Sequence, residues 1–160
     1  MGIRIVREFG DDVLRKKSKP VRELTPRLQQ LIDDMFETMY DQEGVGLAAP
    51  QVGVLRRIVV IDVTGENPLV FVNPEILESD GEQTGAEGCL SLPGKHATVT
   101  RPSHVKVRAL DRQMQPFELE AEGLLARAVC HEFDHLEGVL YIDKMSGELE
   151  DNAAPEGDEE

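Results

Sequence analysis

A chain of 160 residues with 40% hydrophobic content is long enough to form one domain with a substantial core. No long apolar run follows Met1, so the sequence shows neither a secretory signal nor a membrane span, and we expect a cytoplasmic location without a membrane partner. The formal net charge of −14 and the lack of a basic stripe with interleaved aromatic residues argue against direct binding to nucleic acid.

The first predicted element is a helix over residues 26–42. Thr25 is the expected N-cap, and Pro26 stands in the first helical position, where its missing N–H costs no hydrogen bond. Gly44 follows where a helix needs a left-handed terminating residue. Apolar residues recur at the helical interval and form one stripe, which we expect to be buried: Leu28, Leu31, Ile32, Met35 and Met39.

The middle of the chain has the pattern of short antiparallel strands. Its apolar stretches are β-branched or alternating, and Gly, Pro, Asn or Asp separates them. They are RRIVVIDV (56–63), PLVFVNPEI (68–76), HATVTRP (96–102), HVKVRALD (104–111) and PFELEAE (116–122). A second helix is predicted over residues 123–135, after which GVLYIDKM (138–145) returns toward the sheet. This order predicts an α+β fold with antiparallel strands packed around the late helix.

The C-terminal stretch is strongly acidic and has no basic residue. Its acidic residues are Glu148, Glu150, Asp151, Glu156, Asp158, Glu159 and Glu160. Such a composition is typical of a disordered, solvated segment. We therefore expect a single domain over residues 1–146 and a disordered tail over residues 147–160.

The predicted second helix carries an H-E-x-x-H motif in AVCHEFDHLEG (128–138). His131 and His135 are four residues apart, so they project from one helix face and could bind one cation. Glu132 flanks that face and could act as a base without binding the ion. Cys130 points the other way, which favours a packed thiol. The alternative is a surface helix whose histidines and acids are simply solvated.

A hydrolytic centre of this type needs a third protein ligand and an open position for water. Cys89 in EGCLSLPG (87–94) is the best candidate, because Gly88 and the following Pro-Gly pair indicate a tight turn near a ligand. A buried structural cysteine is the alternative. His96 and His104 rank lower, since each has a polar, strand-like context. A closed structural zinc site that adds Cys130 conflicts with the helical angles.

A third motif, GVGLAAPQ (44–51), supports two interpretations. It could be a helix terminator followed by a segment that fills the core. Alternatively, Gly44 and Gly46 allow the backbone to line a cleft, and Gln51 offers its amide N–H groups to a developing oxyanion.

In their order and spacing, GVGLAAPQ, EGCLS and HEFDH resemble the three signature motifs of peptide deformylases. The resemblance extends over almost the whole chain before the acidic tail. It implies a metal site of Cys89, His131 and His135, the general base Glu132, an oxyanion hole of Gln51 and the Leu90 backbone N–H, and Gly46 at the cleft. One position departs from the family pattern, because Cys130 stands where glutamine is usual.

The resemblance also implies the activity, which is hydrolysis of the formyl group from the N-terminal formylmethionine of new polypeptides, releasing formate. Ferrous iron (Fe²⁺) is the implied divalent ion, and Zn²⁺, Ni²⁺ or Co²⁺ fits the same ligands. The expected partners are N-formylmethionyl nascent polypeptides, with transient proximity to the ribosome. Three residues are expected to line the methionine pocket: Ala128 and Leu124 on the metal face, and Val45 in the glycine loop.

The main alternative is an H-E-x-x-H metallopeptidase that cleaves internal peptide bonds. Such enzymes usually take their third ligand downstream of the motif. Only a short segment and the acidic tail follow His135, so a downstream ligand would come from a stretch expected to be disordered.

Overall fold

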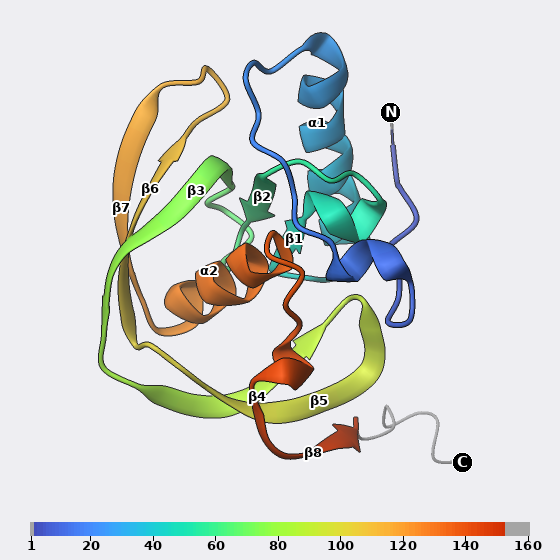
Figure 1. The fold of residues 1–160 in the computed structure, drawn as a ribbon, viewed down its shortest axis with the longest axis vertical. Helices are drawn as coiled ribbons and strands as arrows, with labels where there is room; N and C mark the ends of the chain where they lie inside the picture. Colours follow the sequence, from blue (N-terminus) through green and yellow to red (C-terminus); the bar gives the residue numbers. More distant parts are fainter. Residues whose placement is uncertain (1, 153–160) are drawn as a thin grey trace.

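Two α-helices and two antiparallel sheets make up the computed structural model, which describes residues 2–152 (Figure 1). The five-stranded sheet has the order β1-β2-β3-β6-β7, and the three-stranded sheet has the order β4-β5-β8. The helices are α1 (Pro26–Asp41) and α2 (Gly123–His135). The strands are β1 (Gly46–Ala48), β2 (Ile58–Ile61), β3 (Leu69–Asp80), β4 (Gln83–Cys89), β5 (Leu92–Arg101), β6 (His104–Leu110), β7 (Pro116–Glu122) and β8 (Met145–Asp151). The predicted α+β fold is confirmed.

Helix α1 begins as predicted and ends one residue earlier. The Thr25 side chain accepts a hydrogen bond from the Leu28 N–H at 3.2 Å, which satisfies one free donor of the first turn. The left-handed residue after the helix is Glu43, with φ of 59°, so the prediction that Gly44 fills this role was wrong. Gly44 lies against the Leu90 side chain instead, and a Cβ there would lie 2.9 Å from Leu90 Cδ1, so that side chain would have to shift.

Helix α2 has the predicted bounds and packs against the five-stranded sheet. Phe133 meets Phe71 of β3 edge to face, with ring centroids 5.5 Å apart. Val105 and Val107 of β6 belong to the same buried cluster. Figure 1 shows α2 within the curve that the strands form around it. This packing fixes the position of α2 relative to the sheet.

Three strands were missed by the sequence patterns: β1, β4 and the C-terminal β8. Strand β1 has only three residues and lies in the glycine-rich motif, where it pairs with β2 in the register Leu47↔Val60. Strand β4 (QTGAEGC) contains two glycines and little apolar surface, and it is held by pairing with β5. All three depend on a partner strand elsewhere in the chain, which local propensity does not report.

The end of the described chain differs from the expected tail. Strand β8 pairs with β5 in the register Lys95↔Asp151, His96↔Glu150, Thr98↔Ser146 and Val99↔Met145, with a register shift between His96 and Thr98, so the expected tail belongs to a strand as far as Asp151. Lys95 also forms an ion pair with Asp151, and this opposite charge offsets the acidity of the strand. Residues 153–160 of the expected tail lie outside the described residues. Among the helices of residues 2–152, none has the length and apolar character needed to cross a membrane.

Candidate metal centre

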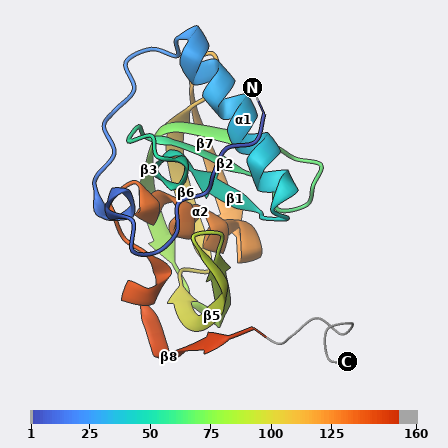
Figure 2. The ribbon, with the colours of Figure 1, turned by 90° about the vertical axis from the view of Figure 1, so that its right-hand side faces the viewer.

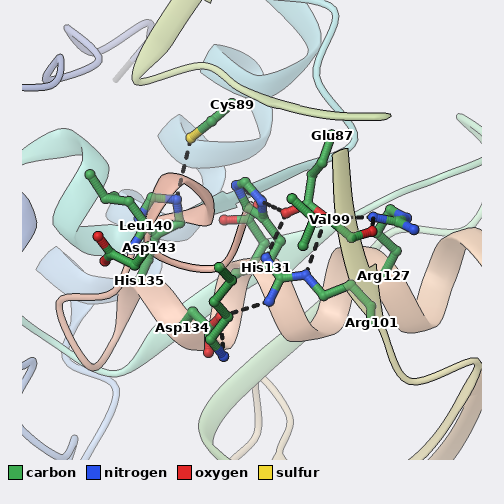
Figure 3. A network of polar contacts seen from close by, with 12 residues as sticks. Glu87, Cys89, Val99, Arg101, Arg127, His131, Asp134, His135, Leu140 and Asp143 are labelled. Carbon is green, nitrogen blue, oxygen red and sulfur yellow. Dashed lines mark hydrogen bonds and ion pairs between the residues drawn. The ribbon is translucent and has the colours of Figure 1, made fainter. Parts of the chain in front are cut away.

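Cys89 at the end of β4 meets His131 and His135 of α2 (Figure 3). One donor atom from each lies within 4.8 Å of the others, and Cys89 Sγ is 3.4 Å from His135 Nε2. A sulfur and a nitrogen that bind one tetrahedral ion at about 2.3 and 2.1 Å lie roughly 3.6 Å apart. The donors therefore have the spacing and chemistry of a Cys-His-His metal site typical of deformylases.

The other thiol and the two other histidines lie away from this group. Cys130 is buried in the core between α2 and the five-stranded sheet, and burial raises the pKa of its thiol. His96 contacts Asn152, with Nδ1 2.7 Å from Oδ1. His104 lies 2.8 Å from Glu120 across strands β6 and β7. None of the three is placed to share the ion.

Glu132 lies beside the metal group in a tightly limited space. Burial is the main influence on its carboxyl group and raises its pKa to about 7, with a further increase from the charge of Glu87. Its Oε1 atom has no hydrogen-bond partner among the described residues. A Cβ at Gly46 would lie 2.7 Å from Glu132 Oε2, so only glycine at position 46 leaves room for the carboxyl group. Glu132 therefore combines a near-neutral pKa with a free oxygen atom.

The Gln51 amide is fixed next to Cys89. Gln51 is buried, and its Oε1 accepts a hydrogen bond from the Ala48 N–H at 3.0 Å. Its Nε2 donates to Ser91 Oγ at 3.1 Å and lies 3.6 Å from Cys89 Sγ. Leu90 follows Cys89 directly, at the turn between β4 and β5. The structure thus brings Gln51 and Leu90 to the metal group from two separate motifs.

A cavity of about 490 Å³ opens over the metal group. The three residues expected at the methionine pocket, Val45, Leu124 and Ala128, all line it, and so does Gly46, which was expected at the cleft. Val45 and Leu124 are 39% and 54% exposed, whereas Ala128 is 5% exposed. The first two therefore belong to the mouth of the cavity, and Ala128 to its wall near the histidines.

A buried ion network behind His131 was not predicted from the sequence. Glu87 Oε2 lies 2.5 Å from His131 Nδ1, and Arg101 and Arg127 pair with the same carboxylate at 2.6 and 2.8 Å (Figure 3). Burial raises the pKa of Glu87, but the hydrogen bonds from His131 and Arg101 outweigh it and lower the pKa to about 2. A carboxylate on Nδ1 orients the ring and leaves Nε2 available to bind an ion.

Two further residues contact His131 and the Cys89 sulfur. Tyr141 stacks on the His131 ring, with centroids 6.0 Å apart and planes at 27°. Ser91 is fully buried, and its N–H donates to Cys89 Sγ at 3.4 Å. Glu87 and Ser91 flank the cysteine in the EGCLS motif, and this position was the only sequence signal that they belong to the site. The sequence around Tyr141 gave no such signal.

Comparisons with known proteins agree with this site. A family model described as polypeptide deformylase matches residues 3–150. The chain is 59% identical to a peptide deformylase of Lachnoclostridium phytofermentans, with 100% of this chain and 99% of that protein covered. The crystal structure of a Legionella pneumophila peptide deformylase superimposes with a TM-score of 0.88 at 52% identity, covering 91% of this chain and 87% of that one. The crystal structure of the Thermotoga maritima peptide deformylase superimposes with a TM-score of 0.89 at 46% identity, covering 92% of this chain and 100% of that one. The chain therefore belongs to the peptide deformylase family.

Proposed function

We propose that this deformylase removes the formyl group from formylmethionyl polypeptides with a divalent ion held by Cys89, His131 and His135. The observation that carries the proposal is the meeting of these three donors, from two distant motifs, beside a cavity that Cys89, His131 and Glu132 line. A bound divalent ion polarises a carbonyl oxygen and lowers the pKa of a coordinated water to about 7. The protein supplies the remaining functions through its own side chains.

Glu132 is the proposed general base and acid. Its buried carboxyl group, with a pKa near 7 and an unpartnered oxygen, is suited to take a proton from water and return it to the departing amine. Gln51 Nε2 and the Leu90 backbone N–H are proposed to bind the oxygen of the formyl group as negative charge develops on it. Each such donor contributes about 3 kcal/mol to stabilising a transition state.

Val45, Gly46, Leu124 and Ala128 are proposed to bind the substrate. Because a Cβ at Gly46 would lie 2.7 Å from Glu132 Oε2, we expect little space between these two lining residues for a group larger than hydrogen on the carbonyl carbon. The metallopeptidase alternative loses its support, because the third donor is the upstream Cys89.

Fe²⁺ is the proposed ion, with Zn²⁺, Ni²⁺ or Co²⁺ accepted by the same ligands. The substrates are N-formylmethionyl nascent polypeptides, which implies work in the cytoplasm with transient proximity to the ribosome. We also propose a single catalytic domain that extends beyond residue 146 to include strand β8.

The test compares formyl-Met-Ala-Ser, acetyl-Met-Ala-Ser and a longer blocked peptide, with formate and new amines both quantified. We expect formate release to exceed acetate release by at least about 100-fold, because an extra methyl displaces the reacting carbon by roughly 1 Å. The blocked peptide should stay intact. Equal rates on the formyl and acetyl peptides, or internal cleavage without formate, would overturn the assignment.

A further inference from the structure

The N-terminal segment, residues 4–9, forms main-chain hydrogen bonds to Gln51 and to Ser91, the two residues whose side chains are bonded to each other. The Arg7 N–H donates to the carbonyl oxygen of Gln51 at 2.7 Å, and the Phe9 N–H donates to the carbonyl oxygen of Ser91 at 2.8 Å. Figure 2 shows this segment, in dark blue, descending from beside α1. Two separate motifs are therefore tied to a single stretch of main chain.

Ser91 also determines which way the Gln51 amide points. The Ala48 N–H holds Gln51 Oε1, so the amide cannot rotate its nitrogen into that position without losing a bond. An amide nitrogen carries two hydrogens, and Ser91 Oγ accepts one of them. The other remains on the side of Cys89, where the formyl oxygen is expected. Ser91 is itself held at its N–H by Cys89 and at its carbonyl by Phe9.

We propose that Ser91 is a positioning residue for deformylation and acts through Gln51, with the Arg7 and Phe9 main chain holding the pair in place. The inference rests on the oxyanion role proposed above for Gln51. Without the Ser91 hydroxyl, the amide nitrogen loses this hydrogen-bond partner, and the bond from Ala48 to Gln51 Oε1 is left to hold the amide in its direction. The transition state is then less stabilised and kcat falls, because the developing oxyanion is the group that this amide is placed to bind.

A double-mutant cycle tests the proposal. In Gln51→Leu we expect kcat to fall about 100- to 1000-fold, as for loss of one oxyanion donor. In Ser91→Ala it should fall about 10- to 100-fold, with KM within about twofold and metal content unchanged. Adding Ser91→Ala to Gln51→Leu should cost less than about twofold more, since residues that act together are not additive. The matched control is Ser18→Ala, which removes a buried hydroxyl without a hydrogen-bond partner among the described residues and should leave kcat unchanged.

The outcomes separate this proposal from the one on which it rests. An unchanged kcat in Gln51→Leu contradicts the oxyanion role of Gln51. If Gln51→Leu lowers kcat as expected, but Ser91→Ala lowers kcat by the same factor in the parent and in the Gln51→Leu variant, then Ser91 does not act through Gln51. Loss of metal in Ser91→Ala would also overturn it, because the effect would then pass through Cys89.

A second comparison tests the N-terminal segment. Phe9→Pro removes the N–H that holds Ser91, whereas Phe9→Ala keeps it and removes only a side chain that is 56% exposed. We expect Phe9→Pro to lower kcat about 10-fold and Phe9→Ala to leave it within about twofold. Equal kcat values in the two variants contradict the role of the segment. Should circular dichroism show that Phe9→Pro is unfolded, the Ser91 cycle alone decides the proposal.

Discussion

At the scale of single residues, Glu132 lies so close to strand β1 that position 46 admits no side chain. A Cβ there would lie 2.7 Å from Glu132 Oε2 and 2.8 Å from its Cγ. The sequence suggested Gly46 as a residue that lets backbone line a cleft, and the cavity agrees with that use. Its closeness to Glu132 had no local signal, because the two residues are far apart in the chain and meet only when α2 packs against β1.

Gly46→Ala should therefore disturb the carboxyl group directly. We expect kcat to fall about 10- to 100-fold, because Glu132 must move, and stability to fall by about 1–3 kcal/mol from overpacking. The control is Gly85→Ala in β4, where a Cβ would have only one ordinary contact, 3.6 Å from Arg127. Formate release and urea unfolding measure both effects, and similar behaviour of the two variants would contradict the steric argument.

The proposed proton-handling role of Glu132 has its own test. Glu132→Gln keeps the shape of the side chain and removes the base, so we expect kcat to fall by about 100-fold or more while metal content stays unchanged. Metal analysis and formate release on one preparation check this. A metal-free variant would show that Glu132 supports the ion instead.

The two thiols should differ under oxidation. Cys89 lies in the cavity as a metal donor, whereas Cys130 is buried with a raised thiol pKa. Because the thiolate is the reactive form, peroxide should inactivate the parent and the Cys130→Ala variant at the same rate. Cys89→Ser should lose metal and activity from the start. Protection from peroxide in Cys130→Ala would place the sensitive thiol in the core.

At the scale of elements, most of the fold could be predicted from local patterns. The cap and apolar stripe of α1, the bounds of α2, and the five alternating stretches all correspond to elements of the structure. Strands β1, β4 and β8 could not be predicted, because glycine-rich or acidic segments become strands only through pairing with β2 or β5. The same limit hid the ion network, since Glu87 on β4 meets His131 on α2 only in the folded chain.

That network should matter for both stability and metal binding. Glu87→Gln leaves the buried Arg127 guanidinium group without a carboxylate and leaves Arg101 with Asp134 alone, so we expect a loss of about 3–5 kcal/mol in the free energy of unfolding. Metal affinity should fall about 10- to 100-fold as His131 loses its orienting partner. The control is Glu118→Gln, which removes the exposed ion pair of Glu118 with Arg108 between β6 and β7. Its loss should lower the free energy of unfolding by less than about 1 kcal/mol. A Glu87 variant as stable as the Glu118 variant would contradict this account.

At the scale of the whole molecule, the catalytic site is a product of topology. Its parts come from residues 44–51, 87–91 and 131–135, which the two sheets and α2 bring together. The motifs identified the residue types, and the helical spacing placed two of the metal donors on one face. The distances of Cys89, Gln51 and Gly46 from α2 could not be predicted from the sequence, because they depend on how the two sheets pack around this helix.

The C-terminal region offers a test at this scale. Strand β8 contributes backbone pairing with β5 and the Lys95–Asp151 ion pair, whereas residues 153–160 contain four acidic residues and, apart from two alanines, no hydrophobic residue. We expect a chain ending at Asn152 to keep formate release and a melting temperature within about 2 °C of the parent, because a charged segment buries little apolar surface. A chain ending at Lys144 should melt several degrees lower, at roughly 2–4 °C for each kcal/mol lost. Calorimetry of the three chains decides the matter. Equal melting temperatures would show that β8 adds nothing to stability, and a large loss on removal of residues 153–160 alone would show that the acidic end stabilises the domain.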